Sequence, residues 1–442
     1  MSKKLHLISL GCNKNLVDSE VMLGKLHTYT LTNEPSEADV IIVNTCGFIE
    51  AAKEESINTI LEASNLKKEN SLLVVSGCLS ERYKNELIEA IPEVDIFTGV
   101  GDYEKIDEII ANKQTTFTPD VYLANENSPR LITGSKYHAY IKLSEGCNQN
   151  CSFCAIPSFK GRLKSRTIES VVAEVSNLIK QGFRDFSFIS QDTSSYGRDL
   201  GNKDALIDLI HQIELLPGIK SARVLYLYPS TTTFELIDAI ANSPIFQTYF
   251  DMPIQHISDN MLKIMKRGAN KEKTIELLEY MKSKDQAFIR TAVIAGHPGE
   301  SEDNFLELKE FIKNFEFDRA TVFEYSNEEN TTAYNLEQIS KDIISKRANI
   351  LGEIARELMV KSNSKLIDKE IELIVDGKSS EHEFLLSARA TLWAPEIDGE
   401  ILINDTSDLK VEHGDYFKAK ITQLADTTPL ATLIKKIWSI KS

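Results

Sequence analysis

Hydrophobic positions in the first part of the chain follow two alternating patterns. Short apolar runs typical of buried strands, "LHLISL", "VIIVNT", "LLVVSG" and "DIFTGV", are separated by stretches with helical spacing such as "IEAAKEESINTILEAS". This alternation predicts an open α/β domain with a parallel sheet over residues 3–119. Residues 120–135 follow neither period and contain Pro, Gly and Asn, so we interpret them as a linker.

A second α/β series follows this linker. Six strand-like runs, "HAYIKLS", "DFSFIS", "ARVLYLY", "TYFDMPI", "FIRTAVIAG" and "ATVFEYS", alternate with helical segments and predict a partial (β/α)6 barrel over residues 133–364. This range ends in a long helical stretch near residues 338–364. Shorter runs, "EIELIVDG", "FLLSARATLW", "EILIND" and "YFKAKITQL", predict a small antiparallel, OB-like β-barrel over residues 366–437.

Composition predicts a cytoplasmic protein without a membrane partner. The 442 residues are 42% apolar, yet nowhere do about eighteen apolar residues run together, as a membrane-spanning helix requires. The formal net charge of −16 disfavours a large nonspecific contact with phosphate backbones. A basic protein is therefore an electrostatically easier partner.

The six cysteines divide into two groups of three. The barrel cysteine trio has C-x3-C-x2-C spacing after the first barrel strand, and the N-terminal cysteine trio follows three separate strands of the first domain. Carboxyl strand ends carry the ligand sites in both folds, so each trio should occupy one site. Metal binding in a reducing compartment is favoured over disulfides. A zinc knuckle lacking its fourth ligand and ordinary buried cysteines are the structural alternatives. The barrel trio is Cys147, Cys151 and Cys154, and the N-terminal trio is Cys12, Cys46 and Cys78.

The barrel trio, at the mouth of a βα barrel, resembles the signature of the radical S-adenosylmethionine superfamily. The resemblance implies a 4Fe-4S cluster whose fourth iron is chelated by the methionine part of S-adenosylmethionine. It also implies contacts to this cofactor from the ends of several barrel strands and from the cysteine loop. The implied contact residues are Phe153, Gln191, Asp192, Gly296, Pro298 and Gly299.

The whole chain is similar to the methylthiotransferases, which add a C-terminal domain called TRAM. The segments "LGCNKNLVDSE", "SQDTSSYG", "YPS" and "APEIDG" resemble the RimO branch, whereas "MPIQHIS" and "MKRG" are shared with the tRNA-modifying MiaB branch. The resemblance implies a second 4Fe-4S cluster on the N-terminal trio, an electron donor protein, and no catalytic side-chain nucleophile. It further implies methylthiolation of an aspartate β-carbon in ribosomal protein S-twelve. S-adenosylmethionine then serves as methyl donor and as source of a 5′-deoxyadenosyl radical.

Two other functions remain open, a tRNA methylthiotransferase of the MiaB type and a non-enzymatic iron–sulfur carrier. The C-terminal region from Asp368 onward contains 14 acidic and 9 basic residues, a net charge of −5, which makes tRNA an unlikely partner. An acidic surface complements a basic ribosomal protein, and we expect the acidic cluster of Glu396, Asp398 and Glu400 to contribute to it.

Three features of the sequence are expected to lie at the surface. Trp393 and Lys160 depart from the family pattern, and we interpret both as surface changes. The basic run "KGRLKSR" at residues 160–166 offers a counterargument, because its side chains could bind phosphate. We instead expect this run to form a solvated loop beside an anionic cofactor.

Overall fold

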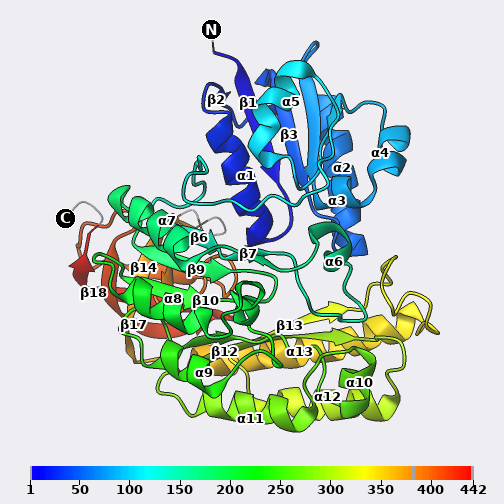
Figure 1. Ribbon diagram of the computed structural model, residues 1–442. Coiled ribbons are helices and arrows are strands. Elements are labelled where there is room, and N and C mark those ends of the chain that lie inside the picture. The colour runs from blue at the N-terminus through cyan, green and yellow to red at the C-terminus, as the bar shows by residue number, and fades with distance from the viewer. Residues whose placement is uncertain (1, 380–381, 383, 440–442) are drawn as a thin grey trace.

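The protein was analysed as a computed structural model, which describes residues 2–379, 382 and 384–439. Figure 1 shows the N-terminal domain on top, the barrel with its helices below, and the C-terminal strands against one side of the barrel. Among the described residues, no helix is both long and apolar enough to cross a membrane.

The N-terminal domain is built on a fully parallel sheet in the order β2-β1-β3-β4-β5. Alternate residues of the central strands pack on opposite faces, since Ile42 and Val74 join one apolar cluster while Ile41 and Val75 join the other. Strands buried on both faces explain the continuous apolar runs in the sequence. The strands are β1 (Lys4–Ser9), β2 (Thr30–Leu31), β3 (Val40–Thr45), β4 (Leu72–Gly77) and β5 (Ile96–Phe97), and the α-helices are α1 (Asn13–Lys25), α2 (Glu50–Leu66), α3 (Cys78–Arg82), α4 (Lys84–Ala90) and α5 (Ile106–Asn112).

All six predicted barrel strands form. They pair in parallel as two three-stranded sheets, β10-β9-β6 and β11-β12-β13, and an isolated parallel bridge between Ala222 and Phe246 lies at their junction. The curved sheet is open, which confirms a partial barrel. The strands are β6 (His138–Lys142), β9 (Asp185–Ile189), β10 (Ser221–Val224), β11 (Tyr249–Asp251), β12 (Phe288–Ala295) and β13 (Arg319–Glu324); a separate short ribbon pairs β7 (Ser144–Glu145) with β8 (Lys164–Ser165).

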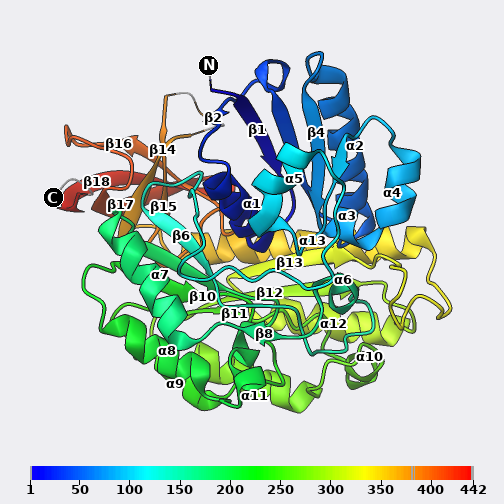
Figure 2. The ribbon, with the colours of Figure 1, turned by 45° about the horizontal axis from the view of Figure 1, so that its top comes forward.

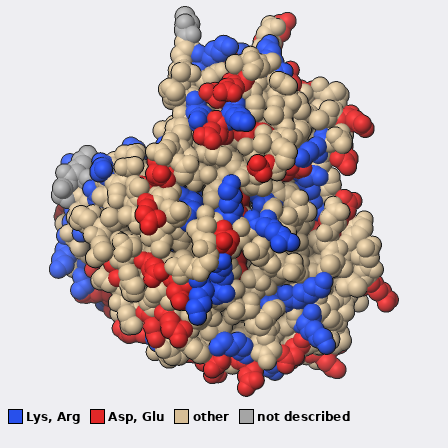
Figure 3. Space-filling model, viewed as in Figure 1, with Lys and Arg blue, Asp and Glu red and all other residues tan. Residues whose placement is uncertain are grey.

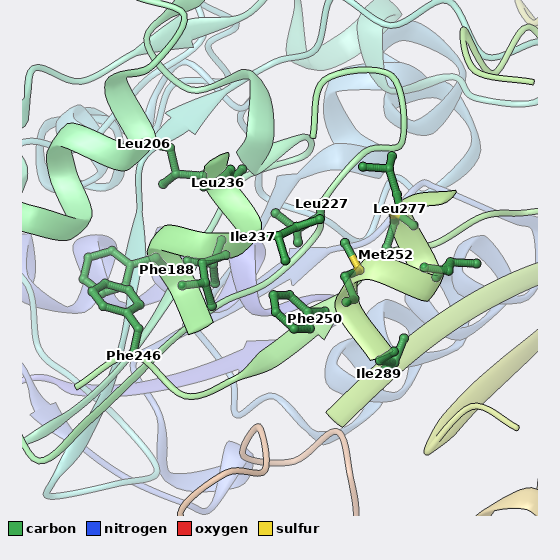
Figure 4. Packing of buried hydrophobic residues seen from close by; sticks show 14 of the residues in the cluster. Phe188, Leu206, Leu227, Leu236, Ile237, Phe246, Phe250, Met252, Leu277 and Ile289 are labelled. Atoms are coloured by element: carbon green, nitrogen blue, oxygen red, sulfur yellow. The ribbon is translucent and has the colours of Figure 1, made fainter. Parts of the chain in front are cut away.

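Helices cover the outer face of these sheets, and several begin at a polar cap. The Thr167, Thr233 and Asn270 side chains each accept a hydrogen bond from the first turn of their helix. Figure 4 shows the core between helices and sheet, where Phe188, Phe250 and Ile289 point toward Leu206, Leu236 and Leu277. The helices are α6 (Ile156–Lys160), α7 (Ile168–Lys180), α8 (Ala205–Glu214), α9 (Phe234–Ala241), α10 (Asp259–Ile264), α11 (Lys271–Lys282), α12 (Glu302–Phe315) and α13 (Lys341–Ser364).

The C-terminal domain is a closed five-stranded barrel in the order β14-β15-β16-β18-β17. The prediction of an antiparallel barrel needs one correction, because β16 and β18 pair in parallel and β18 was not among the predicted strands. This parallel pair joins the two ends of the sheet and leaves no free edge. The strands are β14 (Glu370–Lys378), β15 (Leu386–Ala390), β16 (Ile401–Asp405), β17 (Tyr416–Ala425) and β18 (Thr428–Trp438).

This small barrel packs on the inner face of the larger one. Tyr140, Ile189 and Leu225 point inward from β6 and from the ends of β9 and β10, and they share an apolar cluster with Trp393 and Phe417. Trp393 is 2% exposed, so its interpretation as a surface change is wrong. An apolar ring fits this position because it packs against Phe288 and the other inward-facing residues of the larger barrel.

A buried ion-pair group strengthens the same contact. Asp185, at the start of β9, is fully buried and lies 3.0 Å from Arg223 and 2.5 Å from Arg389 of the C-terminal barrel. Burial by itself would raise the pKa of Asp185, but the two guanidinium groups outweigh burial and lower it below the usual 3.8. The small barrel is thus docked by paired charges as well as apolar contacts.

Surface charge follows a different pattern from the one expected. Lys and Arg side chains gather across the middle of the face shown in Figure 3, where the N-terminal domain meets the barrel.

Asp398 was expected in an exposed acidic cluster, but it is 2% exposed and accepts a 2.7 Å hydrogen bond from the backbone amide of Ala394. Glu396 is exposed and Glu400 is partly exposed, so the acidic cluster at the surface is reduced to these two residues.

Candidate active site

The N-terminal cysteine trio lies at the carboxyl edge of three adjacent strands, β1, β3 and β4. Glycines let the three loops approach. A Cβ atom added to Gly11, whose φ is +81°, would lie 2.8 Å from the Cys46 sulfur, and one added to Gly47 would lie 2.8 Å from the backbone of Leu79. The chain folding thereby brings three distant cysteines to one place.

The three cysteines of this trio differ in exposure. Cys12 is exposed, whereas Cys46 and Cys78 are partly buried. Burial raises the pKa of the Cys46 thiol to about 11. Burial also raises the pKa of the Cys78 thiol, although the nearby Lys160 ammonium opposes this increase. Buried thiols of this kind become thiolates when a cationic group binds them.

The barrel cysteine trio follows β7, on the loop that leads into α6. Cys147 accepts a 3.4 Å hydrogen bond from the backbone amide of Gln149, and burial raises the pKa of both Cys147 and Cys154 to about 12. Ser152 is tied to the turn after β12, the fifth barrel strand, by a 2.9 Å hydrogen bond with His297. This loop is therefore held to the barrel by its own polar contacts.

Two residues that the sequence did not single out contact the central cysteine of the barrel trio. The Arg267 guanidinium donates to the Cys151 sulfur at 3.3 Å, and the Tyr228 hydroxyl lies 3.3 Å from the same sulfur. The Arg267 side chain also stacks 4.1 Å from the centre of the Tyr228 ring. Tyr228 belongs to the "YPS" segment and Arg267 to the "MKRG" segment. The resemblance of these segments to the methylthiotransferases was the sequence signal that could have identified both residues.

The donor set of each trio fits an iron–sulfur cluster that keeps one iron open. Each trio offers three thiols from one loop or one sheet edge, and Arg267 supplies a positive charge beside a sulfur that becomes a thiolate on binding. Within the ranges that the structure describes, no three Cys, His, Asp or Glu side chains are arranged to hold a single metal ion.

Four buried charged side chains join the surroundings of the two trios, and we call them the charge bridge. The Lys142 ammonium donates to Asp18 and lies 2.8 Å from Glu145, while the Lys160 ammonium lies 3.3 Å from each of these carboxylates. All four side chains are at most 5% exposed. Asp18 belongs to α1, which begins directly after Cys12, and Glu145 lies two residues before Cys147.

Burial of two basic side chains corrects two surface predictions. Lys160 is 5% exposed and paired, so it is not a surface change. Arg166 is likewise 5% exposed and donates to Glu174, whereas Arg162 and Lys164 of the same basic run are exposed. The expected solvated loop is thus wrong for two of its four basic residues. Figure 2 shows α3 next to α6 at the junction of the two domains, and α1 contacts β6 at the same junction.

The side chains predicted to contact the cofactor lie around the same barrel mouth. Gln191 donates to Glu145 of the charge bridge, and its own carbonyl oxygen is buried without a hydrogen-bond partner among the described residues. Asp192 is buried and accepts a 2.8 Å hydrogen bond from Gln149, which lies between two cysteines of the barrel trio. Phe153 is partly buried, with its ring edge-on to His297 at 6.2 Å.

The turn after β12 contains the remaining predicted contacts. Gly296 adopts a φ of +82°, and a Cβ atom there would lie 2.4 Å from the Ile344 side chain of α13. Its amide donates to Glu300 at 2.9 Å. Pro298 is buried and Gly299 is exposed, with a φ of +87°. Helix packing therefore requires glycine at position 296 whether or not a ligand is bound.

Family comparisons cover the three domains separately. Residues 4–99 match the family described as "Uncharacterized protein family UPF0004", residues 141–312 match the radical SAM superfamily, and residues 367–434 match the TRAM domain. A solved radical S-adenosylmethionine methyltransferase, TsrM from Kitasatospora setae, has the same fold with a TM-score of 0.56 at 16% identity, covering 76% of this chain and 77% of that one. The chain is thus a radical S-adenosylmethionine enzyme.

Full-length relatives define its family within that class. Ribosomal protein uS12 methylthiotransferase RimO from Sulfurovum sp. (strain NBC37-1) is 66% identical, covering 98% of this chain and 99% of the relative. The protein of the same name from Aliarcobacter butzleri is 56% identical, covering 98% of both chains. The chain belongs to the RimO family of methylthiotransferases.

Proposed function

We propose that this protein methylthiolates the β-carbon of an aspartate in ribosomal protein uS12. S-adenosylmethionine is both the methyl donor and the source of a 5′-deoxyadenosyl radical. Identity of 66% over nearly the whole chain with a relative of that named activity carries the proposal. The proximity of the two cysteine trios, joined by the charge bridge, supports it because one substrate carbon must meet chemistry at both sites.

The proposal assigns a 4Fe-4S cluster to each trio. When bound, the barrel cluster would supply the electron that cleaves S-adenosylmethionine, and the N-terminal cluster would hold the sulfur that is methylated and transferred. The chain's own side chains position these groups. Arg267 and Tyr228 orient Cys151, while Asp192 and Gln149 hold the cysteine loop against the barrel. An external protein delivers the electrons.

We propose that S-adenosylmethionine binds at the barrel mouth. The contacts come from Phe153, Gln191, Asp192 and the turn containing Gly296, Pro298 and Gly299. The unpaired carbonyl oxygen of Gln191 supports this assignment, because a buried acceptor without a donor costs free energy unless a ligand satisfies it. A radical route suits the target carbon, which no side-chain base deprotonates at ordinary pH. Accordingly, no side chain is assigned as a nucleophile.

The decisive experiment presents the anaerobically reconstituted enzyme with both candidate substrates in parallel. Purified uS12 and total tRNA are each incubated with S-adenosylmethionine and a reductant, then digested and analysed by mass spectrometry. We expect a methylthio group on one aspartate of uS12 and no new methylthio nucleoside. Modified tRNA with unmodified uS12 would establish the MiaB-type activity instead. Cys151→Ala, which removes one thiolate from the barrel trio, should give neither product.

A further inference from the structure

Lys14, in the first turn of α1, reaches from the N-terminal domain to the barrel mouth. Its ammonium lies 3.5 Å from the centre of the Tyr226 ring, which follows β10, and it is close enough to Cys12 and Glu145 to interact with both electrostatically. Lys14 therefore stands between the N-terminal trio and the barrel mouth, where a substrate must lie.

Tyr226 holds an unusual backbone conformation at this point. Its φ is +64°, in the left-handed region that non-glycine residues rarely adopt. The conformation is held by two hydrogen bonds, a 3.1 Å bond from its amide to Asp251 and a 2.9 Å bond to its carbonyl from Thr193. Backbone strain of this kind concentrates at binding sites, and here it presents the ring beneath the Lys14 ammonium.

The other cations near the mouth already have partners. Lys142 and Lys160 pair with carboxylates of the charge bridge, Arg290 lies 2.8 Å from Asp251, and Arg267 contacts Cys151. Lys14 has no carboxylate within ion-pair distance among the described residues, and its contacts are the ring and hydroxyl of Tyr226. An ammonium retains strong donor capacity in such a position.

We propose that Lys14 binds the side-chain carboxylate of the substrate aspartate and is a specificity-determining residue. This inference rests on the proposed function, in which the reacting β-carbon is directly bonded to that carboxylate. A cation between the two trios holds the carboxylate and so fixes the adjacent carbon between them. No acidic residue lies in the first turn of α1, so the positive end of this helix adds to the charge of Lys14.

The test compares substrate binding by holoenzyme variants. Anaerobic dissociation constants are measured for full-length uS12 and for uS12 with its target aspartate replaced by asparagine. Wild-type enzyme should prefer the aspartate form by about ten- to hundredfold, the range expected for a hydrogen bond to a charged group. Lys14→Met and Lys14→Gln should bind both forms equally, while Lys14→Arg should retain part of the preference.

Lys25→Met is the matched control, because Lys25 ends the same helix and its ammonium lies 3.7 Å from the exposed Glu104. It should keep the wild-type preference and activity. Equal binding of both uS12 forms by the wild-type enzyme would overturn the inference, as would an iron-replete Met or Gln variant with the wild-type preference. If uS12 is not modified at all, the proposed function fails instead. Modification of uS12 without discrimination between the two forms refutes only the role of Lys14.

Discussion

Replacing Lys142 with Met should destabilise the barrel strongly, because the substitution leaves an excess of negative charge in the interior. Lys142 and its partners Asp18 and Glu145 are each 1% exposed, so solvent does not screen the carboxylates that remain. Removing one partner of a buried ion pair typically costs about 3–5 kcal/mol. Lys160 still lies 3.3 Å from both carboxylates and compensates in part, which places the expected loss near the lower limit.

The measurement is thermal unfolding followed by circular dichroism, with Lys180→Met as the control at an exposed lysine of α7. For a domain of roughly 200 residues, each kcal/mol lowers the melting temperature by about 2–4 °C, so Lys142→Met should melt roughly 6–12 °C below wild type. Adding Asp18→Asn should recover part of this loss, because Glu145 and Lys160 then form a balanced pair. A Lys142→Met melting curve that coincides with the control would refute the reasoning.

Three further predictions concern the cysteine trios and the domain contact. Changing the N-terminal trio to Ala should lower the iron content from about eight to about four per chain while 5′-deoxyadenosine still forms. A wild-type enzyme with only about four irons per chain would contradict the assignment of two clusters. Arg267→Met, which removes the charge beside the barrel trio, should slow 5′-deoxyadenosine formation roughly tenfold or more, whereas exposed Arg356→Met should not. Asp185 has a pKa lowered below 3.8 by its arginines, so it stabilises the fold above that pH and this contribution is lost as the pH falls further. Melting temperatures between pH 4 and 2 should therefore fall less steeply for Asp185→Asn, which starts from a lower stability; parallel curves would exclude Asp185 as the titrating group.

Local sequence patterns were sufficient for most of the architecture. Continuous apolar runs identified the central strands of both α/β domains, since a strand buried on both faces has no polar alternation. The same patterns set the cysteines at strand ends, and the parallel-sheet rule then predicted that three distant cysteines share an edge. They did not reveal β18 or its parallel pairing with β16, because register across a closed barrel depends on strands far apart in sequence.

Burial of polar and charged residues was decided by the tertiary structure. Lys160 and Asp398 are residue types usually found at the surface, yet both are buried. Lys160 pairs with Asp18 of the N-terminal domain, and Asp398 accepts a hydrogen bond from a turn in its own loop. The Asp18 partner of Lys142 lies 124 residues away, so no local window contains the pair. Lys14 acquires its position in the same way, through contact with Tyr226 from a different domain. The sequence by itself determined which chemistry the cysteines support, whereas folding decided which charges surround them, because charge is a local property and burial is not.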